Sequence, residues 1–170
     1  MKNILSFFLL LICLDRTLHS NDFNQIPLSE FIENNSVKIP NFENEELLTE
    51  NLIYESTRCS ALFAWIGSVS GNLKNEKGRK LEKKSIFNSK SLTSLALQTL
   101  LAKTNDPSNL DEVNLEVNNL IEKNFMNYQS DGSIIKGLEG GYIKGYIKED
   151  LEICNIMIEA YKETFKKSKN

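Results

Sequence analysis

The sequence predicts an all-α protein with a single domain, arranged like a four-helix bundle. Apolar residues recur at steps of three and four along four separate stretches, which is the period of a helix that buries one face. No stretch of useful length alternates apolar and polar residues as a half-buried strand does. Two cysteines fall on the apolar stripes of the first and last stretches, where one disulfide could join them.

The first residues are typical of a secretory signal peptide. Lys2 supplies a positive charge, and residues 4–14 are apolar with one serine among them. This run is too short to cross a bilayer, which requires about 20 apolar residues. We therefore expect residues 1–20 to be a cleaved leader and residues 21–170 to be an exported domain, periplasmic or secreted.

The composition of the remaining chain is that of one globular domain. Hydrophobic residues make up 41% of the full sequence and charged residues 25%, a balance unlike that of disordered chains. The leader carries two basic side chains and one acidic, so the domain has a net charge of −4. This acidic balance argues against nucleic acid as a partner.

The first long helix is predicted over residues 45–70. Asn44 can cap its first turn and Gly71 can end it. Its apolar stripe carries Leu48, Leu52, Cys59, Leu62, Ile66 and Val69, with Glu55 in the same register. Residues 21–40 precede it as an irregular segment with one short turn at 29–33.

Three further helices are predicted after it. A charged linker over residues 72–84 leads to a helix over 85–103, and a turn containing Pro107 leads to a third helix over 109–128. The next segment contains four glycines, which indicates a loop over 129–141. The fourth helix then spans 142–166 and ends in a lysine-rich turn that suits the negative pole of a helix.

The cysteine count favours one disulfide. Cys13 lies in the leader, where lipid attachment is disfavoured because Ile12 occupies a position that requires a small residue. Cys59 and Cys154 remain, and an even number in an exported protein indicates a pair. Each lies near the middle of its helix, and the first and last helices of an up-down bundle are neighbours. Two free thiols are the alternative.

One short pattern resembles sequences of a known kind. The segment Arg58-Cys59-Ser60-Ala61-Leu62-Phe63, with Asp150 four residues before Cys154, is similar to a pattern in uncharacterised small exported α-helical proteins with two cysteines. The resemblance implies a disulfide-linked helical fold and no activity.

The residue inventory excludes several kinds of catalysis. The single histidine, His19, lies in the leader, so the domain has no Ser-His-Asp or Cys-His arrangement. The common histidine-dependent zinc sites are excluded for the same reason, and no glycine-rich phosphate loop is present. We expect no metal and no cofactor.

Paired carboxylates are the chemistry that remains. Two acids flanking a sugar bond can hydrolyse it, so a small hydrolase of envelope glycans is an alternative function. The acids considered are Glu45, Glu46, Glu55, Glu139 and Asp150, but their spacing selects no pair.

Residues 127–138 partly match a calcium-binding loop. Gly132 and Ile134 stand where an EF-hand loop has its glycine and apolar residue. However, Asn127 and Gln129 replace acids, and Leu138 occupies the position of the bidentate glutamate. An ordinary Asp-Gly turn is the better interpretation.

A basic cluster falls in the predicted linker. It contains Lys74, Lys77, Arg79, Lys80, Lys83 and Lys84, offset by two glutamates. It could contact an anionic membrane or an acidic partner, which gives peripheral membrane binding as a further alternative function. A solvated linker is the simpler interpretation.

The residues around the cysteines are the remaining candidates for binding. They are Tyr54, Arg58, Trp65 and Asp150. Arg58 could pair with an acid across a helix interface, and Trp65 could line a groove. Core packing is the simpler role for the aromatic residues. Because no catalytic group stands out, the expected function is a non-enzymatic binding protein of the cell envelope with an unknown protein or envelope component as partner.

Overall fold

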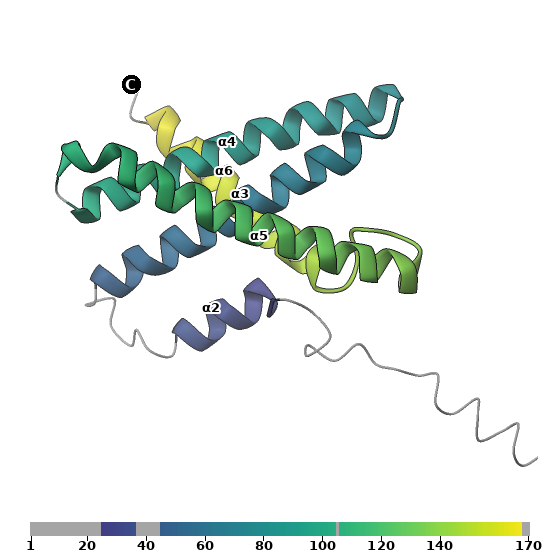
Figure 1. Cartoon of the computed structure of the whole chain (residues 1–170), viewed down its shortest axis with the longest axis horizontal. Helices are drawn as coiled ribbons and strands as arrows, with labels where there is room; N and C mark the ends of the chain where they lie inside the picture. The colour runs from purple at the N-terminus through teal and green to yellow at the C-terminus, as the bar shows by residue number, and fades with distance from the viewer. Residues whose placement is uncertain (1–24, 37–44, 105, 168–170) are drawn as a thin grey trace, which may run out of the picture.

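The computed structural model describes residues 25–36, 45–104 and 106–167, and these segments are helical without a strand. The signal-peptide prediction, with Cys13 and His19, lies outside the described residues. The helices are α2 (Leu28–Ser36), α3 (Glu45–Gly71), α4 (Glu76–Thr104), the 3-10 turn η3 (Pro107–Asn109), α5 (Leu110–Glu139) and α6 (Gly145–Lys167) (Figure 1). The prediction of an all-α fold is confirmed. None of the helices in this described part is long and apolar enough to cross a membrane.

Helix α3 is the centre of the molecule, because it packs against α4, α5 and α6. It forms a long hairpin with α4, and α6 crosses behind this hairpin (Figure 1). The main core surrounds the middle of α3 and includes Leu62, Trp65, Tyr128, Ile147 and Ile158. A smaller cluster joins α3, α4 and α5 through Ile53, Ala96, Leu100, Val113 and Val117.

The N-terminal segment folds more fully than predicted. The single turn expected at 29–33 is a helix of nine residues, α2, which packs against α6. Leu28 at its start is completely buried in the main core. A short amphipathic helix therefore precedes the four long helices.

The charged linker predicted at 72–84 is wrong, because α4 begins at Glu76. The side chain of Asn75 accepts a hydrogen bond from Gly78 N at 2.8 Å and so caps the first turn. The lysines, glutamates and leucine that follow have high helix propensity. A Cβ at Gly78 would lie 2.3 Å from the Leu73 carbonyl oxygen, so this position requires glycine to let the turn close.

The loop predicted at 129–141 is also wrong, because α5 continues to Glu139. Gly132 lies inside the helix against Trp65, where an added Cβ would come within 2.3 Å of the indole ring. The helix ends at Gly140, which takes the left-handed conformation with φ 73°. Neither a calcium loop nor an Asp-Gly turn forms over residues 127–138.

Candidate functional site

A disulfide bond joins α3 to α6. Cys59 of α3 and Cys154 of α6 are bonded, with their Cα atoms 5.3 Å apart. Both are fully buried in the main core. The predicted pairing, between the first and last of the four long helices, is confirmed.

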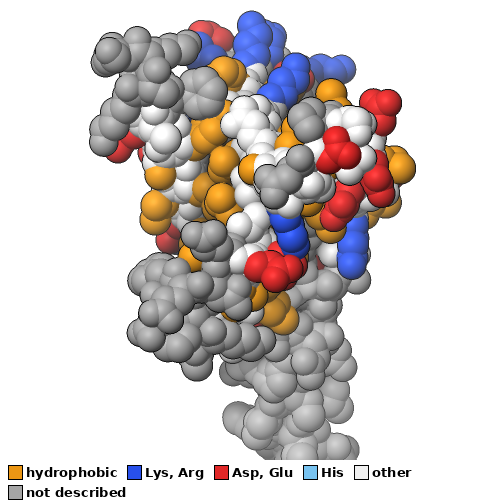
Figure 2. All heavy atoms as spheres, turned by 90° about the vertical axis from the view of Figure 1, so that its left-hand side faces the viewer, with side chains coloured by type: hydrophobic (Ala, Val, Ile, Leu, Met, Phe, Trp, Pro, Cys, Tyr) orange, Lys and Arg blue, Asp and Glu red, His pale blue; other side chains and the backbone are white. Residues whose placement is uncertain are grey.

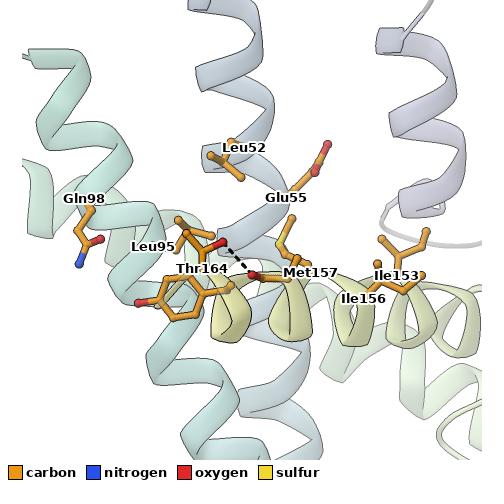
Figure 3. A pocket seen from close by; sticks show the side chains of 10 residues that line it. Leu52, Glu55, Leu95, Gln98, Ile153, Ile156, Met157 and Thr164 are labelled. Atoms are coloured by element: carbon orange, nitrogen blue, oxygen red, sulfur yellow. Dashed lines mark hydrogen bonds between the residues drawn. The ribbon is translucent and has the colours of Figure 1, made fainter. Parts of the chain in front are cut away.

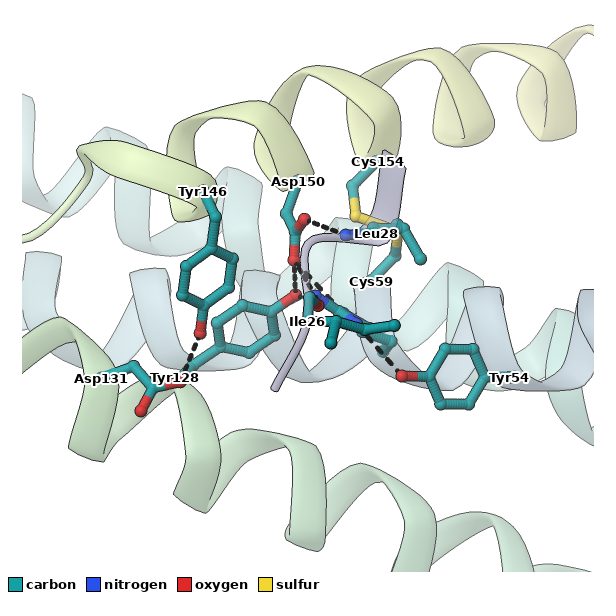
Figure 4. A network of polar contacts seen from close by, with 10 residues as sticks. Ile26, Leu28, Tyr54, Cys59, Tyr128, Asp131, Tyr146, Asp150 and Cys154 are labelled. Carbon is teal, nitrogen blue, oxygen red and sulfur yellow. Dashed lines mark hydrogen bonds and ion pairs between the residues drawn. A yellow bond between two sulfur atoms is a disulfide. The ribbon is translucent and has the colours of Figure 1, made fainter. Parts of the chain in front are cut away.

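A buried ion pair lies beside this disulfide (Figure 4). Arg58 Nη2 lies 2.6 Å from Asp150 Oδ2, and both side chains are 0% exposed. Each residue is adjacent to, or one helical turn from, a bonded cysteine. The disulfide therefore brings α3 and α6 together where the charges of Arg58 and Asp150 can neutralise each other.

Two tyrosines complete the hydrogen bonding of the pair. Tyr128 of α5 donates its hydroxyl proton to Asp150 Oδ2 at 2.5 Å, and its oxygen accepts from Arg58 Nε at 3.1 Å. Tyr54 accepts from Arg58 Nη1 at 3.0 Å. Nothing in the sequence indicates that the hydroxyl of Tyr128 meets this pair. A buried tyrosine normally finds a polar partner, and this was the only available signal.

The same network holds the N-terminal segment. Leu28 N donates to Asp150 Oδ1 at 2.7 Å, and Arg58 Nη2 donates to the Ile26 carbonyl at 2.6 Å. Each guanidinium nitrogen of Arg58 and each carboxylate oxygen of Asp150 therefore has a hydrogen-bond partner inside the fold. A ligand could reach Arg58 or Asp150 only by displacing this segment.

Burial and charge change the proton affinities in the network. Burial raises the pKa of the Tyr128 hydroxyl well above its usual value, and the neighbouring Asp150 carboxylate raises it further. Burial alone lowers the pKa of Arg58, but the oxygens of Tyr128 and Asp150 outweigh this effect and the net pKa is raised. Tyr128 thus stays protonated and Arg58 stays charged, as a structural network requires.

Trp65 does not join this network. It is buried in the core, packs on Gly132 and stacks near Tyr128 with ring centroids 6.3 Å apart. Tyr146 stacks near Tyr128 and donates to Asp131 Oδ2 at 2.5 Å, and burial raises the pKa of Tyr146. The structure therefore brings Tyr54, Arg58 and Asp150 together and leaves Trp65 separate. A binding role for these four residues stays a prediction.

An open groove lies on another side of the disulfide-linked helices (Figure 3). It has a volume of about 600 Å³ and runs between α3, α4 and α6. Its lining consists of Leu52, Glu55, Leu95, Gln98, Ile153, Ile156, Met157, Ala160, Tyr161 and Thr164. Figure 2 shows a vertical band of apolar side chains on the end of the molecule where the C-terminal half of α6 and the start of α3 lie. No sequence signal had singled out this groove, because its residues come from three helices.

Among the residues that the structure describes, Glu55 is the only acidic one that lines this groove. Its side chain is partly buried, and it projects from α3 on the side that faces α2 (Figure 3). Burial raises the pKa of this carboxyl. Among the described residues, no ion pair or hydrogen bond neutralises its charge.

Glu46, Asp150 and Glu139, three of the other carboxylates considered for catalysis, do not meet Glu55 in this groove. Glu46 is exposed beside Lys103 in an adjoining hollow, and it lies about 14 Å from Glu55 along the axis of α3. The two acids of a glycosidase are about 5–9.5 Å apart. Asp150 is fully buried and paired with Arg58, and Glu139 is the last residue of α5.

The basic cluster lies on the α3–α4 turn and on the first three turns of α4. Its six cationic side chains, Lys74, Lys77, Arg79, Lys80, Lys83 and Lys84, are all exposed. Five of them belong to α4 rather than to the predicted linker, and Lys74 lies in the turn before α4.

Comparison with known proteins adds no function. No known family model matches this chain, and no curated protein or solved structure is significantly similar to it. Within the described segments, no three acidic, cysteine or histidine side chains gather as a metal site would require.

Proposed function

We propose that this protein is an exported, non-enzymatic interaction protein of the cell envelope that holds an amphipathic helix of a partner protein in the groove between α3, α4 and α6. The observation that carries the proposal is this apolar groove with a single unneutralised carboxylate. A helix with one apolar face and one basic residue would satisfy both features.

The shape of the groove favours a helix over a small molecule. Its floor is a stripe of α6 from Ile153 to Thr164, which spans about 16 Å, or three helical turns. Ile156 on this stripe is 72% exposed. Small ligands are held in clefts that bury most of their surface. A helix packed along the groove would instead cover an exposed side chain such as Ile156.

Glu55 indicates the charge of the partner. A carboxylate that is partly removed from water is stabilised by an opposite charge nearby. A lysine or arginine that follows the apolar face of the bound helix would supply that charge. The partner would therefore be basic at the position that faces α3.

The proposal that the protein is exported rests on the predicted leader, and the disulfide agrees with it. Disulfides persist in oxidising compartments and are rare in the cytosol. The Cys59–Cys154 bond fixes α6 against α3, so two of the three helices that line the groove are joined covalently. A preorganised groove binds a partner with a smaller loss of conformational entropy.

Site-specific crosslinking in the native envelope tests the proposal. We would place a photo-crosslinking amino acid at Ile156 and, as a matched control, at Leu138 of α5, which is 63% exposed and does not line the groove. We expect one protein to be captured from Ile156 and not from Leu138. Glu55→Lys should reduce that capture at least tenfold.

Two results would contradict this function. Equal capture from both positions would mean that the groove is not the contact surface. Capture of a second copy of the same chain from Ile156 would make the groove a site of self-association instead.

A further inference from the structure

We propose that the outward face of the first half of α4 docks on an anionic lipid surface. This inference does not depend on the groove, which lies at the other end of the α3–α4 hairpin. Between residues 74 and 90 the sequence has seven basic and two acidic side chains, although the whole chain has a net charge of −3. The positive charge is thus concentrated in one place on an acidic protein.

An exposed phenylalanine lies among these lysines. Phe87 is 60% exposed, and it follows Lys83 and Lys84 by four and three residues on α4. Residues at these spacings are neighbours on a helix surface. Lys80 and Lys90 fall on the same face, one turn further in each direction. The result is an aromatic ring surrounded by cations.

Most of these cations are not neutralised within the chain. Lys80 pairs with Glu76 at 2.7 Å, and both side chains are highly exposed. No ion pair is found for Lys77, Arg79, Lys83, Lys84 or Lys90 within the part of the chain that the structure describes. The second acid, Glu82, lies against the backbone at Gly71 rather than on the exposed face.

Further apolar side chains are exposed around the same end of the hairpin. Leu73, Leu81 and Ile86 are each more than a third exposed. Lysine side chains can lay their methylene groups on an apolar surface while the ammonium group stays with water or phosphate. This combination of exposed apolar groups and cations is what binds a helix to the surface of a bilayer.

A lipid surface suits this face better than a folded acidic protein or a nucleic acid. The face is the convex side of a helix, so a rigid partner would need a cavity shaped for Phe87. A nucleic acid could use the cations but could stack on only one aromatic ring. A bilayer accepts Phe87 without a shaped cavity, and each cation near its anionic surface strengthens binding. The end of the hairpin stands clear of α5 and α6, so neither would block the approach (Figure 1).

Vesicle flotation with the full chain tests this inference. The probes are vesicles of phosphatidylcholine alone and vesicles that contain about one third phosphatidylglycerol. We expect binding only to the anionic vesicles, and at least a tenfold weakening in 0.5 M salt, because the Debye length falls to about 4 Å. Lys80→Glu with Lys84→Glu should weaken binding at least tenfold. Phe87→Ser should weaken it by about two- to fivefold.

The matched control reverses the charge of two lysines that lie away from the first half of α4. Lys144→Glu with Lys148→Glu changes the net charge by the same amount on exposed residues before and within α6. This variant should bind within twofold of the unmodified protein. Circular dichroism would show that all variants keep their helical content.

Three results would overturn the inference. The first is equal binding to neutral and anionic vesicles. The second is an equal loss of binding in the Lys144/Lys148 variant, which would mean that net charge alone decides. The third is tighter binding to a single-stranded oligonucleotide than to vesicles of the same anionic charge, which would assign the face to nucleic acid.

Discussion

At the residue scale, the ion pair between Arg58 and Asp150 shows why a buried charge needs complete satisfaction. Its desolvation is opposed by the attraction of the opposite charge and by hydrogen bonds from Tyr128 and Leu28 N. A buried pair of this kind adds little net stability over an apolar pair of the same shape. Removal of one partner is far more damaging, because the other charge then stays buried alone.

Asp150→Asn should therefore lower the free energy of unfolding by about 3–5 kcal/mol, because Arg58 loses its neutralising charge. Urea denaturation of the oxidised protein measures this change. Glu152→Gln is a matched control on the same helix, since Glu152 forms only an exposed pair with Lys148 at 3.8 Å. The control should change the stability by less than about 0.5 kcal/mol. Similar effects of the two substitutions would show that the network is not structural.

Glu55 gives a prediction about pH. Burial raises the pKa of its carboxyl, so the folded state binds a proton more readily than the unfolded chain. Stability should then fall as pH rises through the interval between the unfolded and folded pKa values. Glu55→Gln removes this ionisation and should raise Tm at pH 7, with a smaller difference at pH 4.

The same substitution should weaken partner binding, and this opposition separates a binding residue from a structural one. Glu149→Gln, on the exposed surface of α6, is the control for removal of a negative charge. If Glu55→Gln instead lowers Tm at pH 7, the charge of Glu55 is stabilised within the chain. There would then be no reason to infer that the partner of the groove is basic.

At the element scale, the helical period predicted the fold class and four long helices, but it misplaced two connections. The sequence predicts a linker over residues 72–84 because their charges hide the apolar period, although lysine and glutamate are good helix formers. It predicts a loop over residues 129–141 because they contain four glycines. In the structure, Gly132 permits the close approach of Trp65, which comes from another helix. A sequence read locally cannot reveal such a contact.

Two glycines of α5 provide the test of this explanation. Gly132→Ala should destabilise the protein by more than about 2 kcal/mol, because its Cβ would overlap the Trp65 ring. Gly137→Ala should stabilise it by about 0.5–1 kcal/mol, since a Cβ there meets nothing within 4 Å and alanine is the better helix former. Chemical denaturation of both variants measures the difference. Equal effects would mean that Gly132 has no packing role.

The candidate site was predicted only in part, for a related reason. The sequence predicts the cysteine pair because each cysteine lies on the apolar stripe of its helix. It marks Arg58 and Asp150 as candidates because they lie near the cysteines, but it does not pair them with each other. The groove could not be found, because its lining depends on how α6 crosses the α3–α4 hairpin. The crossing of helices is fixed by packing in three dimensions, and the period of one helix does not contain it.

At the scale of the whole molecule, one bond joins segments 95 residues apart. Closing a loop of that length should stabilise the protein by about 4–5 kcal/mol through the entropy of the unfolded chain. Domains of this size have a total stability of about 5–15 kcal/mol. Much of the stability would therefore depend on an oxidising compartment, and this is the physical reason to connect the fold with export.

The three cysteines allow removal of the leader and formation of the disulfide to be measured in one experiment. Protein isolated from its native host would be treated with an alkylating reagent before and after reduction, and its intact mass would be determined. We expect no alkylated thiol before reduction and two after it, because Cys13 would leave with a cleaved leader while Cys59 and Cys154 are bonded. One thiol before reduction and three after would mean that the disulfide forms but the leader remains attached. Three free thiols before reduction would place the protein in a reducing compartment, and export would have to be abandoned.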